Sequence, residues 1–362
     1  MQAVFRVDAS LLMGTGHIMR CLTLAGALRE LGWSCRFICR EHAGHLIDEI
    51  IGQGFKVLVL PCEGKGEAKI YPTHAVWLGA SQADDATACQ ILLAGEVVDW
   101  LVVDHYALER SWEEAMLPYC RRLLVIDDLA DRFHSCNILL DQNLGRQEED
   151  YSGLVPESCL LLLGCEFALL RAEFSLWRED SLRRRRSGRL QRLLITLGGG
   201  DKDNFTGAVL RALRHCPLPR DCFIDVVLGA QSPWLVEVCA EARKLPWQIT
   251  VEQGVGDMAH RMAIADLAIG AAGSTSWERC CLGLPTLLLV IAENQYPAAT
   301  ALHESGAAIL LPASELPHAL LESLAILQAS PARLAWMGLL AAGICSGAGV
   351  SCLIKKLLEA LP

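Results

Sequence analysis

Between residues 3 and 127, short apolar runs alternate with segments whose apolar positions recur every three or four residues. Residues 3–7 predict a first β-strand, and the apolar spacing from Ile18 to Leu28 predicts a helix after it. The same reasoning predicts strands at 35–39, 56–60, 100–104 and 123–127, and helices at 44–53, 84–93 and 109–117. Pro61, Gly64 and Gly66 predict a loop after the third strand. Strands that alternate with helices form a parallel sheet covered by helices, so the predicted fold class is α/β.

The pattern begins again after a charged segment that ends in four arginines, 183–186. A strand is predicted at 192–197, the glycines 198–200 follow it, and a helix is predicted at 204–215. Further strands are predicted at 224–228, 248–251, 267–269 and 285–291, and helices at 277–282, 314–328, 332–343 and 350–361. This restart predicts two doubly wound domains, 1–180 and 190–340, with 341–362 as a helix that the sequence assigns to neither. The arginine run is interpreted as a solvated helix end or linker, rather than a phosphate or membrane patch.

The loop after the first strand carries the first candidate chemistry. Gly14 and Gly16 predict a tight turn in which the backbone can approach a ligand closely. His17 then lies at the start of a helix, where free N–H groups and the positive end of the helix dipole favour an anionic ligand and a neutral imidazole. A neutral imidazole near pH 7 is suited to act as a general base; a histidine that only caps the helix is the alternative. The third glycine of a dinucleotide fingerprint would fall at Met19, which disfavours NAD.

Polar residues follow several of the predicted strands. Ligands bind beyond the carboxyl ends of the strands in sheets of this kind, so these residues are expected along one rim. They are Asp8, the loop 14–17, Asp104, His105, Tyr106, Asp127 and Asp128.

Small residues and hydroxyls open a helix in the second half, after a short strand. Backbone N–H groups and hydroxyls at Gly273, Ser274 and Thr275 are therefore predicted to hold a diphosphate. Glu278, about one turn further, is a poor phosphate ligand and is predicted to accept hydrogen bonds from ribose hydroxyls. The alternative is an ordinary helix capped by Ser274, with Glu278 as a first-turn acid. The glycines 198–200 in the same domain favour the nucleotide.

Composition narrows the class of protein. The chain has 362 residues, of which 52% are hydrophobic and 20% charged, which suits about two globular domains. Its net charge of −10 disfavours a nucleic-acid-binding protein, although a nucleotide needs only a local site. The 16 cysteines lie mostly in apolar runs without Cys-x-x-Cys spacing, which indicates buried thiols in a reducing compartment. Arg6 and Asp8 beside the first apolar run argue against a signal peptide, and no uninterrupted apolar run reaches the ~18 residues that span a membrane. We therefore expect a cytoplasmic protein.

Several motifs taken together resemble one family. They are 6–10 (Arg-Val-Asp-Ala-Ser), 14–22 (Gly-Thr-Gly-His-Ile-Met-Arg-Cys-Leu), 104–106, 127–128, 141–143, 167–174, 198–201, 273–275 and 294–295. Over about residues 3–310 the chain resembles the PseG family of UDP-2,4-diacetamido-2,4,6-trideoxy-β-L-altropyranose hydrolases, which act in pseudaminic acid biosynthesis. The resemblance implies the GT-B fold of the MurG-like proteins. In that fold two Rossmann-like domains face one another, and a UDP-sugar lies in the cleft between them with its nucleotide mainly on the C-terminal domain.

The resemblance also implies roles for residues. His17 would activate a water that attacks the anomeric carbon, so that the C–O bond breaks with inversion and UDP is released. Asp8 and Tyr106 complete the predicted catalytic group, and with Asn143 they are candidates to orient His17, the water or the acetamido groups. Residues implied to contact the substrate or nucleotide are Gly14, Thr15, Gly16, Asn143, Arg171, Gly198, Gly199, Gly200, Gly273, Ser274, Thr275, Glu278, Asn294 and Gln295. No metal and no cofactor are implied, and the expected partner is the small UDP-sugar rather than nucleic acid or membrane.

Three other functions are weighed against this hydrolase. A UDP-sugar-dependent GT-B glycosyltransferase would share the fold, the glycine loops and the base. A membrane-facing one is expected to carry an apolar and basic patch in its N-terminal domain, but the sequence shows none there, and the nearest basic run, 183–186, lies at the presumed domain junction. A non-hydrolysing UDP-N-acetylglucosamine epimerase needs more acid and base groups than His17 and Tyr106 provide. A non-enzymatic UDP-sugar binder is disfavoured, because a neutral histidine beside a phosphate cradle is a catalytic arrangement.

Overall fold

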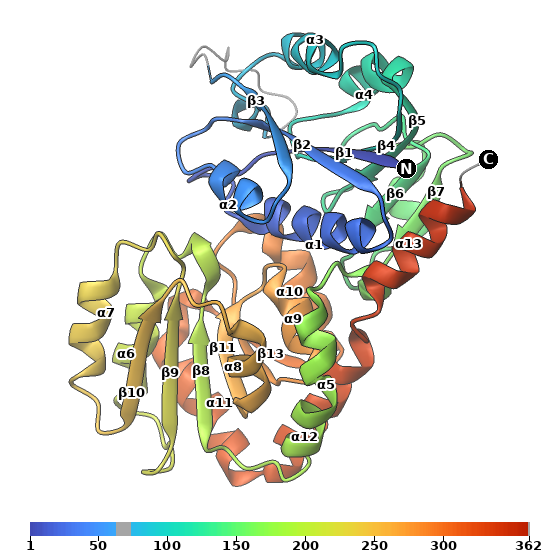
Figure 1. The fold of residues 1–362 in the computed structure, drawn as a ribbon. Helices are drawn as coiled ribbons and strands as arrows, with labels where there is room; N and C mark the ends of the chain where they lie inside the picture. Colours follow the sequence, from blue (N-terminus) through green and yellow to red (C-terminus); the bar gives the residue numbers. More distant parts are fainter. Residues whose placement is uncertain (63–73, 361–362) are drawn as a thin grey trace. The chain divides into compact units, whose positions relative to one another are not determined.

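The computed structural model describes residues 1–62 and 74–360, so the loop predicted at Gly64 and Gly66 lies outside the described residues. The chain forms two compact units. The first comprises Met1–Leu169 together with Gly349–Pro362, and the second comprises Leu170–Ala348. The last helix, which the sequence assigned to neither domain, therefore belongs to the first unit (Figure 1).

The first unit is built on a seven-stranded parallel sheet in the order β3-β2-β1-β4-β5-β6-β7. Its strands are β1 (Gln2–Val7), β2 (Ser34–Arg40), β3 (Lys56–Leu60), β4 (Val98–Asp104), β5 (Cys120–Ile126), β6 (Ile138–Asp141) and β7 (Leu160–Leu163). The central strands β1 and β4 are buried along nearly their whole length, because helices cover both faces of the sheet.

Two groups of helices cover this sheet. The helices are α1 (Gly16–Glu30), α2 (Ile47–Gly52), α3 (Gln82–Leu93), α4 (Arg110–Met116) and α13 (Gly349–Glu359). Apolar residues of α1, α2 and α13 share one core with the stacked rings of Phe5 and Phe37, whose centroids lie 4.9 Å apart. Apolar residues of α3 and α4 form a separate core that includes Leu101 and Val103 of β4. The sheet thus lies between two helical layers.

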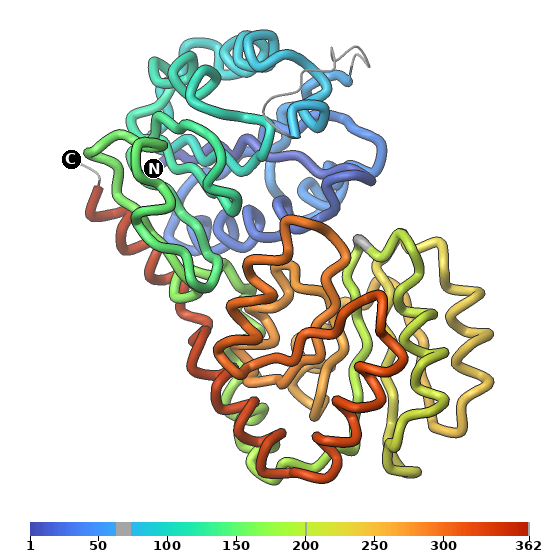
Figure 2. The backbone as a smooth tube through the Cα atoms, turned by 180° about the vertical axis from the view of Figure 1, so that it is seen from behind, coloured from blue at the N-terminus to red at the C-terminus, as the bar shows by residue number. Residues whose placement is uncertain are grey.

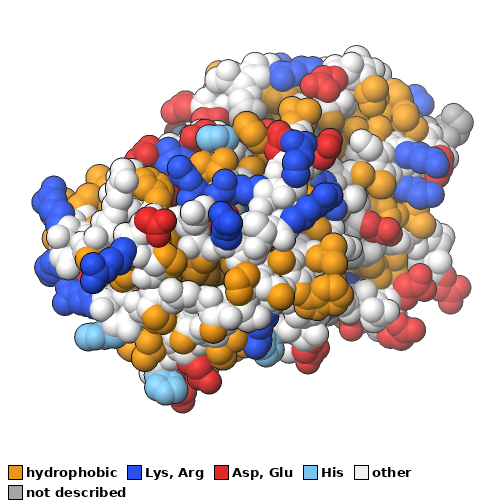
Figure 3. All heavy atoms as spheres, turned by 90° about the horizontal axis from the view of Figure 1, so that it is seen from below, with side chains coloured by type: hydrophobic (Ala, Val, Ile, Leu, Met, Phe, Trp, Pro, Cys, Tyr) orange, Lys and Arg blue, Asp and Glu red, His pale blue; other side chains and the backbone are white. Residues whose placement is uncertain are grey.

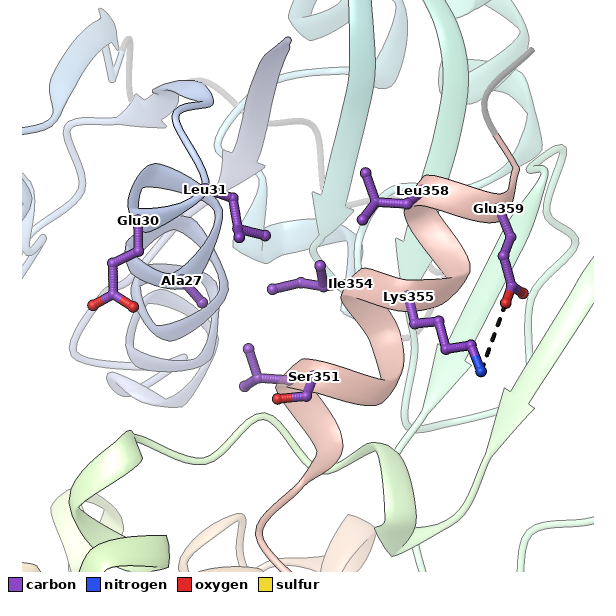
Figure 4. A pocket seen from close by; sticks show the side chains of 9 residues that line it. Ala27, Glu30, Leu31, Ser351, Ile354, Lys355, Leu358 and Glu359 are labelled. Carbon is purple, nitrogen blue, oxygen red and sulfur yellow. Dashed lines mark ion pairs between the residues drawn. The ribbon is translucent and has the colours of Figure 1, made fainter.

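A shallow groove runs between α1 and α13 (Figure 4). It has a volume of about 650 Å³, and its lining includes Ala27 and Leu31 of α1 and Ile354 and Leu358 of α13. These α1 residues lie near the C-terminal end of the helix, at least ten positions from its start, which corresponds to roughly 15 Å along the helix axis. The groove is therefore remote from the loop that follows β1.

The second unit repeats the layout on a six-stranded parallel sheet in the order β10-β9-β8-β11-β12-β13. Its strands are β8 (Arg192–Thr196), β9 (Phe223–Leu228), β10 (Gln248–Gln253), β11 (Leu267–Ala271), β12 (Thr286–Leu289) and β13 (Ala308–Leu311). Its helices are α5 (Ala172–Arg185), α6 (Phe205–Leu213), α7 (Leu235–Ala242), α8 (Met258–Ile264), α9 (Thr275–Cys281), α10 (Tyr296–Glu304), α11 (Leu316–Ala329) and α12 (Pro331–Ile344). The restart of the pattern near residue 192 thus marks the first strand of a new sheet.

The interpretation of the arginines at the end of α5 as a solvated segment holds for only part of the run. Arg183 fits it, with 63% of its side chain exposed. The interpretation is wrong for Arg185, which is 6% exposed and donates hydrogen bonds to the carbonyl oxygens of Ala265 and Leu282 at 2.7 and 2.8 Å. Through these hydrogen bonds the buried guanidinium of Arg185 fixes α5 to the C-terminal ends of α8 and α9.

One stretch, Pro331–Glu359, is long and apolar enough to cross a membrane by length and composition. In the structure this stretch is α12 and α13, separated by non-helical residues 345–348, and the two helices belong to different units (Figure 2). Each helix buries apolar residues, among them Leu334 and Met337 of α12 and Leu353 and Leu357 of α13. On the face drawn in Figure 3, exposed apolar side chains are interspersed with charged ones. The stretch is thus two packed helices rather than one continuous span.

Each sheet contains one point at which the strand order reverses. In the first unit it lies between β1 and β4, and in the second between β8 and β11. The loops that leave the carboxyl ends of these paired strands lie next to each other, and in doubly wound folds this is where ligands bind. The predicted loops 14–17, 198–200 and 273–275 and Tyr106 follow these four strands, whereas Asp128, Asn143 and the pair 294–295 follow β5, β6 and β12.

Candidate functional site

The loop after β1 has the tight turn that its glycines predicted. Gly14 has a φ of 76°, a backbone conformation that residues other than glycine rarely adopt, and its N–H donates to the carbonyl of Ser10 at 2.8 Å. Helix α1 begins at Gly16, after Thr15, whose side chain makes no capping hydrogen bond. His17 therefore lies in the first turn of α1, as predicted, and only 8% of it is exposed.

His17 contacts a carboxylate at the end of the neighbouring strand. Its Nδ1 lies 2.6 Å from Oδ1 of Asp104, the last residue of β4, which pairs with Val7 of β1 in the sheet register. An ionised carboxylate only accepts hydrogen bonds, so Nδ1 carries the proton, and Nε2 of a neutral ring is left as the acceptor. The tautomer required of a general base is thus fixed by the strand pairing.

Arg20 holds Asp104 in its ionised form. Its Nε and one terminal nitrogen donate to the two oxygens of Asp104 at 2.6 and 2.7 Å, and the other terminal nitrogen donates to Asp128 at 2.7 Å. Burial raises the pKa of Asp104, but the charges of Arg20 and His17 and the hydrogen bonds from both hold this pKa well below its ordinary value. Sequence reasoning gave Arg20 no role; its position three residues after His17, on the same helix face, was the available signal.

Tyr106 and Asp128 complete the group around His17. The Tyr106 ring meets the His17 ring edge-on, with centroids 4.6 Å apart, and its hydroxyl donates to Oδ2 of Asp128 at 2.7 Å. Burial and the Asp128 carboxylate raise the pKa of Tyr106 well above its ordinary value, so the phenol stays neutral. Among the described residues, Oδ1 of Asp128 is buried without a hydrogen-bond partner, and Asn143 donates to the Asp128 carbonyl at 3.1 Å. Asp128 thus keeps one acceptor available.

Asp8 lies on the same rim but does not contact His17. Its Oδ1 accepts from Arg6 at 2.7 Å and from the backbone N–H of Arg40 at 2.6 Å, and its Oδ2 lies 3.3 Å from Nε2 of His105. Burial raises the pKa of Asp8, but Arg6 and the neighbouring histidines hold it well below its ordinary value. The structure therefore brings His17, Tyr106 and Asn143 into one network and places Asp8 in an adjacent buried ion pair.

In the second unit, the two glycine-rich loops follow the adjacent strands β8 and β11. Gly198–Gly200 forms a single 3-10 turn, in which Gly198 has a φ of 71°. The carboxylate of Asp201 accepts from the N–H groups of Phe205 and Thr206 at 2.6 and 3.0 Å, so the start of α6 already has an anionic cap.

The start of α9 is arranged differently. Ser274 is exposed and its side chain makes no capping hydrogen bond, although the sequence allowed it to be an ordinary cap. Thr275 accepts from the buried Arg279 at 3.2 Å, and Arg279 also donates to the carbonyl of Ala271 at 2.7 Å, which fixes this turn to the end of β11. The N–H groups of Ser276 and Trp277 donate to the carbonyls of Gly273 and Ser274 at 2.9 and 3.2 Å, so an anion at this turn would be met by the N–H groups of residues 273–275.

Glu278 and Arg171 lie together beside this turn. Glu278, on α9, is 3.9 Å from Arg171, which also pairs with Glu173 at 2.9 Å. Burial raises the pKa of Glu278 to about 7, with Arg171 and Arg279 opposing the shift, and 18% of its side chain remains exposed. Glu278 can therefore change its protonation state near neutral pH.

The remaining predicted contacts, Asn294 and Gln295, follow β12 in the turn Glu293–Gln295. Asn294 is exposed, while Oε1 of Gln295 already accepts from the N–H of Ile291 at 3.1 Å. Across residues 1–62 and 74–360, no group of three or more His, Cys, Asp and Glu side chains is arranged to hold a metal ion.

These two doubly wound units define a class of fold that comparisons with known proteins identify. Residues 241–341 match the glycosyltransferase family 28 C-terminal domain. The structure is similar to that of Acinetobacter baumannii MurG, with a TM-score of 0.66 and 16% identity over 99% of both chains. The predicted GT-B fold is confirmed.

Two relatives are similar to this chain in sequence. One is the UDP-2,4-diacetamido-2,4,6-trideoxy-beta-L-altropyranose hydrolase of Campylobacter jejuni, 26% identical over 84% of this chain and 97% of the relative. The other is an uncharacterised protein of Methanocaldococcus jannaschii, 24% identical over 82% of this chain, and the match spans 57% of that protein's length. The resemblance to the PseG hydrolases that the motifs indicated is thus confirmed as a similarity along most of the chain.

Proposed function

We propose that this protein is an enzyme acting on a UDP-sugar, and that it hydrolyses UDP-2,4-diacetamido-2,4,6-trideoxy-β-L-altropyranose to UDP and the free sugar. The observation that carries the proposal is the 2.6 Å contact between His17 and Asp104 where the strand order reverses. A histidine whose tautomer is fixed by a buried carboxylate is the arrangement that general-base catalysis needs. The similarity to the Campylobacter hydrolase supports the choice of substrate.

His17 would act on the attacking water. Its Nε2 accepts a proton from the water as the water oxygen attacks the anomeric carbon, and the C–O bond to UDP breaks with its electron pair leaving on the diphosphate. Attack from the face opposite to the leaving group inverts the anomeric configuration, through an oxocarbenium-like transition state. We assign the orientation of His17 to Asp104 rather than to Asp8, because Asp104 makes the contact.

The sugar would meet the polar groups around Tyr106. The unpaired Oδ1 of Asp128 suits the N–H of an acetamido group, because a buried acceptor without a partner gains most from a new donor. Tyr106 would hold the imidazole plane of His17, and Asn143 would fix the backbone of Asp128. Gly14, Thr15 and Gly16 would allow the substrate to approach the start of α1.

The nucleotide would bind to the second unit. Because Asp201 already caps α6, we assign the main diphosphate contacts to the start of α9, at Gly273, Ser274 and Thr275. Hydrogen bonds from backbone N–H groups to the leaving diphosphate would stabilise the charge that develops there. Glu278 would accept from the ribose hydroxyls. The residues that would line the rest of this site are Arg171, Gly198, Gly199, Gly200, Asn294 and Gln295.

A UDP-sugar-dependent glycosyltransferase is the second candidate function. The observation that favours it is the glycosyltransferase family 28 match at 241–341. The two reactions share the nucleotide site and differ in what attacks the anomeric carbon, which is water in the hydrolase and an acceptor hydroxyl in the transferase.

Labelled water distinguishes these reactions. The purified protein is incubated with the UDP-diacetamido-trideoxy-altrose in H₂¹⁸O without an acceptor, and both products are followed by mass spectrometry. We expect the label in the free sugar and none in UDP, because water attacks carbon. Label in UDP would mean attack at phosphorus and would contradict the role of His17. Tight binding without UDP release would favour the transferase.

Replacement of Glu278 tests the nucleotide site. We expect Glu278→Ala to weaken UDP affinity by about 10- to 100-fold, the usual range for a hydrogen bond to a charged group. Since burial raises the pKa of Glu278 to about 7, the free protein is partly protonated there just below neutral pH. Ribose hydroxyls that donate to the carboxylate lower this pKa, so UDP binding releases a proton from Glu278 and tightens as the pH rises toward 7.

Calorimetry at about pH 6.5 in two buffers of different ionisation enthalpy counts these protons. The wild type should release more protons per UDP than Glu278→Gln, while proton changes on the diphosphate itself are common to both. Glu241→Gln, which alters an ion pair with Arg214 on the surface of the same unit, serves as the control. Equal proton release by wild type and Glu278→Gln, with unchanged affinity, would remove Glu278 from the site.

A further inference from the structure

An exposed thiol, an imidazole and a buried carboxylate follow three neighbouring strands of the first unit. Asp8 follows β1, His42 follows β2 and Cys62 follows β3, and these strands are adjacent in the sheet. The Cys62 Sγ lies 3.7 Å from Nδ1 of His42, and Nε2 of His42 lies 3.6 Å from Oδ2 of Asp8. The three groups therefore stand in the order nucleophile, base and orienting acid.

The carboxylate sets which nitrogen of His42 faces the sulfur. The Asp8 side chain is fully buried, and its Oδ2 is approached by Nε2 of His105 at 3.3 Å and by Nε2 of His42 at 3.6 Å, so it can accept an N–H from each ring. Its pKa is held below the ordinary value against the effect of burial, mainly by Arg6, which keeps the group ionised. A proton on Nε2 of His42 faces this charge, and Nδ1 is then left to accept the proton of the thiol.

The surroundings of the sulfur are compact. Arg40 donates to the carbonyl of Pro61, the residue before Cys62, at 2.5 Å. A Cβ on Gly79 would lie 2.9 Å from the His42 ring, 3.3 Å from Arg40 and 3.6 Å from the Cys62 sulfur, so these three side chains meet around one point. The His42 imidazole is thus held beside the thiol, where it can accept the thiol proton.

Cys62 differs from the other cysteines of the chain. Of the 16, it is the single one that is exposed, while 12 are buried and Cys159, Cys239 and Cys352 are half-buried. Burial raises the pKa of thiols such as Cys35 and Cys216 to about 11, which makes them poor nucleophiles at neutral pH. The exposed thiol also has an imidazole beside it.

We propose that Cys62 is a covalent modification site at which low-molecular-weight disulfides form a mixed disulfide with the protein. The thiol proton passes to Nδ1 of His42, and the Cys62 sulfur attacks one sulfur of the small disulfide. The S–S bond of the reagent breaks as the new S–S bond forms, and the departing thiolate takes the proton from His42. Cys62 is oxidised and one half of the reagent is reduced, so the exchange needs no further reactant. This chemistry is independent of the UDP-sugar reaction.

Reaction of the folded protein with a nitrobenzoate disulfide, whose released thiolate is coloured, tests the proposal near neutral pH. We expect one thiol to react about 10-fold or more faster than free glutathione, since an unassisted thiol is only a few per cent ionised there. Cys62→Ser should abolish this fast phase, and Cys239→Ser should leave it unchanged. With oxidised glutathione, the wild type should gain the mass of one glutathionyl group on the peptide that contains Cys62.

The role of His42 is tested by His42→Asn and His42→Gln. Both should retain one accessible thiol and lose most of the rate advantage, while His45→Asn, a change at a half-buried histidine nearby, should retain it. Two variants are used so that a folding defect in one, detected by its melting temperature, does not decide the outcome. A Cys62 that reacts no faster than glutathione, or whose rate is unaffected in a folded His42 variant, would overturn the proposal.

Discussion

His17→Ala is expected to lower turnover of the UDP-sugar by about two to four orders of magnitude, the usual contribution of a general base, while UDP binds almost as before. The imidazole acts only on the attacking water, so its loss affects the chemical step and leaves the nucleotide contacts of the second unit in place. Turnover is measured by UDP release and UDP affinity by calorimetry. Normal turnover would mean that His17 serves only its buried contact with Asp104 and not catalysis.

The double variant with Asp104→Asn shows whether the two residues act as a unit. Asparagine can still accept from Nδ1 of His17, but it removes the charge that Arg20 and His17 share, so Asp104→Asn alone should lower turnover less than His17→Ala. In the His17→Ala background the second change should have little further effect on turnover, because its effect passes through the imidazole. Additive losses would mean that Asp104 serves catalysis by another route. The melting temperature of each variant shows whether a loss of turnover comes instead from destabilisation by the broken ion pair between Arg20 and Asp104.

Hydrophobic periodicity predicted the helices that bury one face and the strands that are buried along their whole length. The strand at 56–60 and the helices at 84–93 and 332–343 have bounds close to those of β3, α3 and α12. Strands β6, β7 and β13 were missed; each has only four residues, too few to show a period. β12 is as short, but it lies within the longer apolar run 285–291, from which it was predicted.

The rim of candidate residues followed from a general property of parallel sheets, but the contacts within it did not. Asp8 and Asp104 both end strands beside the glycine loop, and the sequence alone did not show which one reaches His17. That choice depends on the strand order, since β4 pairs with β1 in a register that sets Asp104 beside Val7. Arg185 shows the same limit. A run of arginines predicts exposure to solvent, and only the structure shows that backbone carbonyl groups surround Arg185 and accept its hydrogen bonds.

Asp85→Ala is expected to destabilise the first unit by about 3–5 kcal/mol, the cost of leaving buried charges without their partner. Asp85, on α3, is fully buried and accepts from Arg6 at 2.7 Å and from Arg40 at 2.6 Å. It also accepts from the indole N–H of Trp112 at 3.0 Å. Its removal leaves these donors inside the unit, with Asp8 as the remaining carboxylate beside Arg6. Hydrogen exchange of the β1 and β2 amides measures the free energy of opening in this unit.

A surface ion pair in the same unit provides the matched control. Arg36 and Glu96 lie 2.6 Å apart, as close as the buried pairs, but half of the Glu96 side chain is exposed, so Glu96→Ala should cost less than about 1 kcal/mol.

The stabilisation that Asp85 contributes should also depend on pH. Burial raises the pKa of Asp85, but Arg6 and Arg40 hold it below the ordinary value of 3.8. The stabilisation is therefore complete above that value and is lost as the pH falls through the lowered pKa of the folded protein. Equal costs for Asp85→Ala and Glu96→Ala would mean that the ion cluster under the rim contributes no more than a solvated pair, and that apolar packing alone holds β1 and β2 in place.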